Sequence, residues 1–197
     1  TYSMGIRLVR LAHSAWRYSS LVPVARPYIE ELAAKVGEAV HLAQLDNGHV
    51  LFVDKCKATD HFETLAQAGK IAPGYCTGVG KAILAFMPEV EQNRALDQQS
   101  YTAYTPFTLT NRAALMTEIA QIKEDGFAYD REEHEQGIIS IACPILNGQG
   151  RVVGAVSIAS STNRYTIDDL EKQRPNLLKS ANLIGSEAEL WQVPTWS

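Results

Sequence analysis

The stretch that decides the fold is Gly137-Ile-Ile-Ser-Ile-Ala-Cys-Pro-Ile-Leu146, followed by Asn147-Gly-Gln-Gly150 and then by Arg151-Val-Val-Gly-Ala-Val-Ser-Ile-Ala159. Two apolar segments flank four residues of a type that favours a turn. A connection this short joins antiparallel strands, because parallel strands need a long crossover. We therefore predict a hairpin of strands 137–146 and 151–159, and the rest of the sheet is built outward from it.

A second hairpin is predicted earlier in the chain. Asp46-Asn47-Gly48 separates 39–45 from 49–55, and Asn-Gly between apolar segments is the strongest short hairpin signal because both residues tolerate a positive φ. Further strands are expected at 61–65 and 127–130. The sequence thus predicts one mainly antiparallel sheet of about six strands.

Helices are predicted wherever apolar residues recur at a spacing of three to four. Together with the sheet they indicate an α/β (α+β) fold in which helices flank the strands. The first three predicted helices are 5–20, which is apolar almost all round, 22–36 and 77–86. A fourth is capped by Thr110, has Leu115, Ile119 and Ile122 on its inner face and ends at Gly126. The final helix is opened by the capping box Thr166-x-x-Asp169 and is interrupted by Pro175.

The composition excludes several classes of function. The 197 residues are 46% hydrophobic, carry a net charge of -4 and contain no run of Lys or Arg. The sequence is therefore a poor candidate for a DNA-contacting surface, because DNA affinity comes largely from Lys and Arg. Three widely spaced cysteines, Cys56, Cys76 and Cys143, favour a reducing, cytoplasmic location over a disulfide framework. The longest apolar run, 138–146, is too short to span a membrane.

The glycine-rich segment Gly74-Tyr75-Cys76-Thr77-Gly78-Val79-Gly80-Lys81-Ala82 invites comparison with a nucleotide-binding P-loop. The comparison fails because Tyr75 replaces the first glycine and Ala82 replaces the metal-binding Ser or Thr. A helix that starts at small residues can still hold an anion such as a carboxylate on its free amides. The alternative is a tight loop packed against the sheet.

The acidic segment 130–137 is interpreted as a solvated turn. A small hydrolase that pairs His134 with Cys143 or Ser140 is an alternative, but no nucleophile elbow is present. Ser140 and Cys143 also lie an odd number of positions apart in one strand, so they should face opposite sides. No metal or cofactor is expected, although Cys76 with Asp130 could contribute to a zinc site.

Gly126-x-x-x-Asp130-x-x-Glu133, followed after six residues by Ser140-Ile141-Ala142-x-x-Ile145, resembles the signature of the IclR family of bacterial transcription regulators. The family pattern ends in an aromatic or His, where this chain has Leu146. Four more stretches resemble family segments in the same order: Tyr2-x-Met4-Gly5, Gly37-Glu38-x-Val40-x-Leu42, Cys76 to Ala82, and Gly150-x-Val152-x-Gly154-Ala155-x-Ser157.

The resemblance implies a GAF-like, profilin-like effector-binding domain at 21–190, with 191–197 as a tail. It also implies that 1–20 is a linker helix after a winged-helix DNA-binding domain that would precede Thr1. Such domains form homo-dimers or tetramers and bind small organic acids, and they are not enzymes. Operator DNA would be contacted only through the winged-helix domain.

The effector contacts that the resemblance implies fall on Gly78, Val79, Asp130, Ser140 and Ser157. Cys76, Ile83 and Ala159 are further pocket-wall residues. Some family members carry a second serine at the position of Ala159, so one carboxylate donor is missing here. A ligand-free oligomerisation module stays open as an alternative function.

Overall fold

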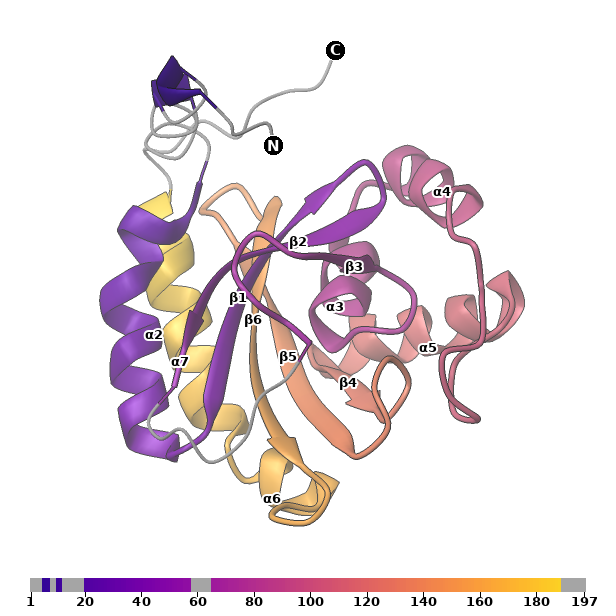
Figure 1. The fold of residues 1–197 in the computed structure, drawn as a ribbon. Helices are drawn as coiled ribbons and strands as arrows, with labels where there is room; N and C mark the ends of the chain where they lie inside the picture. The colour runs from indigo at the N-terminus through magenta and orange to yellow at the C-terminus, as the bar shows by residue number, and fades with distance from the viewer. Residues whose placement is uncertain (1–4, 8–9, 12–19, 58–64, 189–197) are drawn as a thin grey trace.

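The computed structural model describes residues 5–7, 10–11, 20–57 and 65–188 (Figure 1). These residues form one six-stranded sheet in the order β3-β2-β1-β6-β5-β4, and every neighbouring pair is antiparallel. The predicted fold class is therefore confirmed. The strands are β1 (Ala39–Asp46), β2 (His49–Cys56), β3 (Ile71–Pro73), β4 (Ala128–Arg131), β5 (Ile138–Leu146) and β6 (Val152–Ser161).

Both predicted hairpins form, and their turns explain why. Asn47 and Gly48 have φ angles of 48° and 79°, so the two central residues of the β1–β2 turn are both left-handed. In the β5–β6 turn the Asn147 side chain accepts hydrogen bonds from the amides of Gln149 and Arg151, and Gly150 takes a φ of 73°. The turns fix the register of the strands and so decide which side chains share a face.

The two faces of the sheet differ in side-chain size. Large residues of β5 and β6, such as Ile141 and Ile158, face helices α2 (Val22–Val36) and α7 (Arg174–Glu187). Small residues at the alternate positions, such as Ala142 and Ala155, face α3 (Gly78–Phe86), which is backed by α5 (Arg112–Asp125). The small side chains let α3 lie directly on the sheet, and nearly all of its residues are buried.

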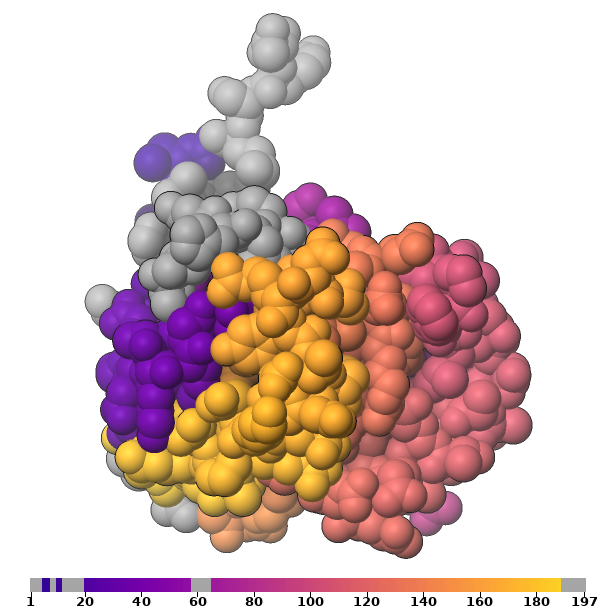
Figure 2. Space-filling view, turned by 90° about the horizontal axis from the view of Figure 1, so that it is seen from below, coloured from indigo at the N-terminus to yellow at the C-terminus, as the bar shows by residue number. Residues whose placement is uncertain are grey.

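Helices α2 and α7 lie side by side on the first face (Figure 1), and in Figure 2 the purple and yellow segments form one continuous side of the molecule. Pro23 stands in the first turn of α2, where the missing amide costs no helical hydrogen bond, and Gly37 ends the helix with a φ of 73°. The predicted bounds of this helix, 22–36, are confirmed.

At the C-terminal end, the capping box of Thr166 and Asp169 opens the short helix α6 (Ile167–Glu171) as predicted. Pro175 lies in the first turn of α7, so the predicted interruption is the start of a separate helix.

Two predictions in the central region need correction, and one helix there was not predicted. The third strand is Ile71–Pro73 and not 61–65; residues 61–64 lie outside the described residues, and Leu65 is not in a strand. The side chain of Asn111, and not Thr110, caps α5 by accepting from the Ala114 amide at 2.9 Å. The sequence interpretation also missed α4 (Glu89–Asp97), whose buried residues are few and largely polar or small.

Most of the predicted helix 5–20 lies outside the described residues. Within the part that is described, Ile6 and Leu11 are helical and exposed on this single chain. No helix in the described stretches is both long and apolar enough to cross a bilayer.

Candidate functional site: a hollow between the α3 tip and the sheet

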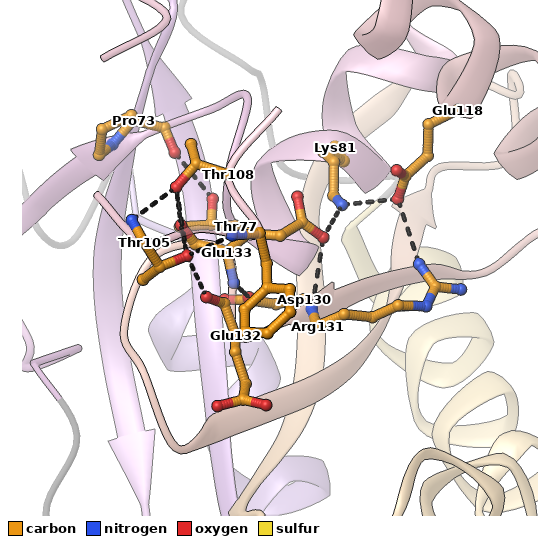
Figure 3. Close-up of polar contacts among 11 residues, drawn as sticks. Pro73, Thr77, Lys81, Thr105, Thr108, Glu118, Asp130, Arg131, Glu132 and Glu133 are labelled. Atoms are coloured by element: carbon orange, nitrogen blue, oxygen red, sulfur yellow. Dashed lines mark hydrogen bonds and ion pairs between the residues drawn. The ribbon is translucent and has the colours of Figure 1, made fainter. Parts of the chain in front are cut away.

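The N-terminal tip of α3 carries amides that no side chain caps. Thr77 occupies the capping position, but its hydroxyl donates to the Pro73 carbonyl at 2.9 Å instead of accepting from the helix (Figure 3). The first helical amide with an internal acceptor is that of Lys81, which bonds Thr77 O. The Gly78 and Val79 amides, which are among the first three of the helix, therefore remain at the positive end of its dipole.

Glycine at this tip is required by close contacts. A Cβ on Gly80 would lie 2.4 Å from the Gly74 carbonyl oxygen, and a Cβ on Gly78 would lie 2.8 Å from Ser140 Oγ. The tip is therefore pressed against both its own loop and strand β5. The two sequence interpretations of this segment, a tight loop and a bare helix start, both describe it.

Strand register brings the predicted polar residues together on the face below this tip. Asp130 pairs with Ser140 across β4 and β5, and Ser140 pairs with Ala159 across β5 and β6. Ser157 precedes Ala159 by two positions, lies on the same face and pairs with His41 of β1. Residues from four strands thus form one surface.

The tip and this surface enclose a hollow with a free volume of about 40 Å³. That is far below the 300 Å³ or more that is typical of ligand pockets, so a ligand larger than a few water molecules has to displace part of the lining as it enters. The predicted residues that line the hollow are Gly78, Val79, Asp130, Ser140, Ser157 and Ala159, and they are joined by His41, Phe52, Ala66, Thr77, His134, Glu135 and Ile138.

Asp130 is a buried carboxyl at the edge of the hollow. Burial raises its pKa to about 7, and the neighbouring Glu133 carboxylate acts in the same direction. Lys81 and the amides of Glu133 and His134 oppose the shift, and the Glu133 amide donates to Asp130 Oδ1 at 2.8 Å. Asp130 can therefore serve as hydrogen-bond donor or acceptor near neutral pH.

A buried ion network holds the loop that follows β4. The Lys81 ammonium is fully buried and donates to Glu133 Oε1 at 2.5 Å and to Glu118 Oε1 at 2.6 Å (Figure 3). Arg131 lies 3.5 Å from the same Glu118 oxygen. The expectation of a solvated acidic turn is therefore wrong for Asp130 and Glu133, which are 7% and 3% exposed.

Two threonines outside the predicted site fasten the same loop from the other side. Thr105 Oγ1 donates to the Glu132 carbonyl and Thr108 Oγ1 to the Glu133 carbonyl, both at 2.6 Å. With the Lys81 network they fix the backbone of residues 131–134 and hence the position of Asp130 and His134 at the hollow.

His41 is a lining residue that the sequence interpretation missed, and His134, which it named only for the alternative hydrolase, also lines the hollow. His41 is buried on β1 and lies edge-on to Phe52, with ring centroids 5.6 Å apart. Burial lowers its pKa to about 3, and the charges of Lys55 and Lys57 add to the effect, so the imidazole is neutral at pH 7. The alternation of β1 could have indicated His41, because a polar residue among apolar ones on a buried strand face is unusual.

The remaining predicted residues lie elsewhere. Cys76 and Ile83 are buried in the apolar core around α3 and are not among the residues that line the hollow. Cys143 lies on the opposite face of the sheet, in the core beside α7, where burial raises the pKa of its thiol. Cys143 and Ser140 therefore face opposite sides of β5, as the strand alternation predicted.

The other sequence alternatives receive little support from the geometry. Ser140 and His134 both line the hollow, but no hydrogen bond joins them in the described structure. Within the described residues, no group of three or more His, Cys, Asp or Glu side chains could hold a metal ion.

The profile of the family described as bacterial transcriptional regulator IclR C-terminal matches residues 13–186. This chain belongs to that family. It is 34% identical over 170 residues to the HTH-type transcriptional regulator XynR of Escherichia coli, a match that spans 86% of this chain and 67% of XynR.

Two solved structures of IclR-type proteins are similar to this domain. The IclR protein of Thermotoga maritima superimposes with a TM-score of 0.86 at 29% identity, over 95% of this chain and 76% of that one. The inducer-binding domain of a PobR double mutant from Acinetobacter, solved with 3-hydroxybenzoic acid, gives a TM-score of 0.78 at 25% identity, over 84% and 97% of the two chains. The IclR domain thus matches in both sequence and architecture.

Proposed function

We propose that this domain senses a small organic acid and is not an enzyme. The observation that carries the proposal is that the uncapped α3 tip and the polar groups of Asp130, Ser140 and Ser157 line one hollow. Free amides at a helix N-terminus favour a carboxylate. The 3-hydroxybenzoic acid bound to the similar PobR domain is an acid of the kind proposed.

Each polar group has a distinct role in this proposal. The amides of Gly78 and Val79 hold the carboxylate, and the Ser157 hydroxyl adds a donor from β6. Asp130 exchanges a hydrogen bond with a hydroxyl of the effector, and Ser140 donates or accepts beside it. Val79 and Phe52 supply apolar walls.

Calorimetric titration of the domain with a panel of aromatic and aliphatic carboxylates, 3-hydroxybenzoate among them, tests this function. Ser157→Ala should weaken the binding of the best acid about tenfold, since a hydrogen bond to a charged group is lost. Ser160→Ala is the matched control: Ser160 lies on the same strand, is fully buried and faces away from the hollow, so affinity should stay unchanged. If no carboxylate in the panel binds, or if Ser157→Ala and Ser160→Ala behave alike, the proposed site is wrong.

We further propose that effector binding controls DNA binding by a winged-helix domain in the longer, cytoplasmic regulator, and that this domain associates as a dimer or tetramer. The support is the similarity to a transcription regulator longer than the matched stretch. Light scattering of the domain tests its association. Mobility-shift assays of the full-length protein, with and without the acid, test the control of DNA binding. An affinity for DNA that the bound acid leaves unchanged would contradict the control.

A further inference from the structure

Strands β1 and β6 form the part of the sheet that connects the hollow with the start of α2. They are paired continuously over five successive residue pairs. His41 and Ser157, which face one another in the middle of this stretch, both line the hollow. A continuous ladder holds the two strands at a fixed spacing, so a displacement at the hollow is passed along both of them.

Leu21 is the residue that attaches the chain preceding α2 to this strand pair. Its amide donates to Gln44 Oε1 at 3.0 Å, and its side chain is fully buried over Gly154, where a Cβ would lie 2.7 Å from Leu21 Cδ1. Both contacts lie three residues along their strand from His41 and Ser157, or about 10 Å at the rise of a β-strand. This α2 joint, formed by Leu21, Gln44 and Gly154, is therefore close to the hollow but on the opposite face of the same two strands.

Two register shifts separate this end of the strand pair from the neighbouring strands. The pairing of β1 with β2 shifts between Leu42 and Ala43, directly before Gln44. The pairing of β5 with β6 shifts directly after the pair of Ile145 and Gly154. A register shift interrupts the ladder locally and lets a strand bend. The end of the β1–β6 pair that carries the α2 joint can therefore move without breaking the regular ladders on either side.

The hollow is too small to be filled without a movement of its lining. Its free volume is about 40 Å³, and the lining residues His41 and Ser157 belong to β1 and β6. We propose that the α2 joint couples occupancy of the hollow to the chain that precedes α2. A bound molecule displaces the strand pair, which draws Gln44 and Gly154 away from Leu21 and changes how that chain is held. The inference rests on the proposed function and adds a route of regulation to it.

Hydrogen exchange of the Leu21 amide tests the coupling without any ligand, because exchange reports local opening. Ala159→Leu adds bulk to the hollow from β6 and so imitates an occupant. It should speed exchange of the Leu21 amide, whose acceptor is Gln44, at least tenfold. Interior amides of α5, which supplies none of the described lining residues, should change by less than threefold. An equal increase at both places reflects general destabilisation and overturns the inference, as does an unchanged Leu21 amide.

Variants of Gln44 test the joint in the full-length protein, through the factor by which the tightest acid of the carboxylate panel changes DNA affinity. Gln44→Met removes the acceptor of the Leu21 amide and should reduce this factor at least fivefold, whereas Gln44→Glu, which keeps an acceptor oxygen, should retain most of it. The acid should bind the Gln44→Met protein at least as tightly as wild type, because the hydrogen bond that opposes the displacement is gone.

Gln92→Met is the matched control for these variants. It removes a buried side-chain hydrogen bond to the Leu84 carbonyl, away from the joint, and should keep the wild-type factor. A wild-type factor in Gln44→Met, or an equal loss in Gln92→Met, overturns the assignment of the joint. If no acid of the panel binds, the proposed function fails, and the exchange of the Leu21 amide in Ala159→Leu still decides whether the hollow and the joint are coupled.

Discussion

Asp130 is the residue whose charge state decides how well an anion fits. With a pKa of about 7, its carboxyl is largely protonated at pH 6 and largely ionised at pH 8. An anionic ligand in the same hollow is repelled by the ionised form and can accept a hydrogen bond from the protonated form. Binding should therefore take up a proton, and affinity should rise as pH falls.

We expect the affinity for a monocarboxylate to increase about tenfold between pH 8 and pH 6, because the protonated fraction of Asp130 rises by about that factor. The ligand's own carboxyl titrates well below this window. Calorimetry at several pH values measures the change, and titrations in buffers of different ionisation enthalpy measure the proton uptake. Asp130→Asn should remove most of the dependence, and a wild-type affinity that is flat from pH 6 to 8 would refute this account.

His41 should make the fold sensitive to acid. Its pKa is about 3 in the folded state and about 6.5 in the unfolded chain, so between these values the unfolded state binds more protons. The contribution of His41 to the free energy of unfolding is fully present above pH 6.5. It is lost as pH falls toward 3, by about 1.4 kcal/mol per pH unit.

His41→Gln should therefore flatten part of the acid limb. The difference in unfolding free energy between wild type and variant, measured by urea denaturation, should shift in favour of the variant by about 1–2 kcal/mol between pH 6.5 and 5. Groups common to both proteins cancel in this difference. A constant difference across that window would show that His41 is not kept neutral by the fold.

At the scale of single elements, α7 shows how a helix can depend on one missing side chain. A Cβ on Gly185 would lie 2.0 Å from the Leu146 carbonyl oxygen at the end of β5. Helix propensity favours alanine there by about 1 kcal/mol, but the overlap with backbone forces α7 off the sheet. The energetic cost of this overlap exceeds the gain in helix propensity. A loss of stability on substitution therefore indicates the overlap, whereas a gain in stability would indicate propensity alone.

Gly185→Ala should lower the free energy of unfolding by about 2 kcal/mol or more, as measured by urea denaturation. Ser186→Ala, at the next and exposed position of the same helix, should change it by less than about 0.5 kcal/mol. If Gly185→Ala stabilises the domain, the close approach of α7 to β5 is wrong.

The elements that could be predicted are those with a strong local signal. Asn47-Gly48 and the capping box at Thr166 specify their turns through two to four residues, and α2 has a regular apolar stripe. Helix α4 buries Gln92, Ala95 and Leu96 and so has no such stripe. Strand β3 is three residues long with Ile71 exposed, and only its pairing with β2 defines it.

At the scale of the whole molecule, the site depends on contacts that the sequence does not encode locally. The likeness to a family indicated Gly78, Asp130 and Ser157 as effector contacts. The Lys81 network escaped prediction because Glu118 and Glu133 lie 37 and 52 residues away along the chain. No local pattern shows which of many charged residues will meet in the core.

This network links three parts of the molecule: α3, α5 and the loop that follows β4. Lys81→Met leaves the carboxylate of Glu133 buried without its cation, and one Glu133 oxygen already has no hydrogen-bond partner in the described structure. Removing one partner of a buried ion pair typically costs about 3–5 kcal/mol. We expect a loss of stability in this range by urea denaturation, and a partial recovery in the double variant Lys81→Met/Glu133→Gln, which removes the unpaired charge.

The same substitution should also change the titration of Asp130 in the hollow, because the charge of Lys81 lowers the pKa of Asp130. In Lys81→Met the midpoint of the pH-dependent affinity for a monocarboxylate should therefore move to higher pH. Lys123→Met, at an exposed lysine in the last turn of α5, controls for the loss of a lysine and should change neither property by much. A variant at Lys81 that loses stability but keeps the wild-type midpoint would mean that the network supports the fold alone, and that charge on α3 does not tune the anion site.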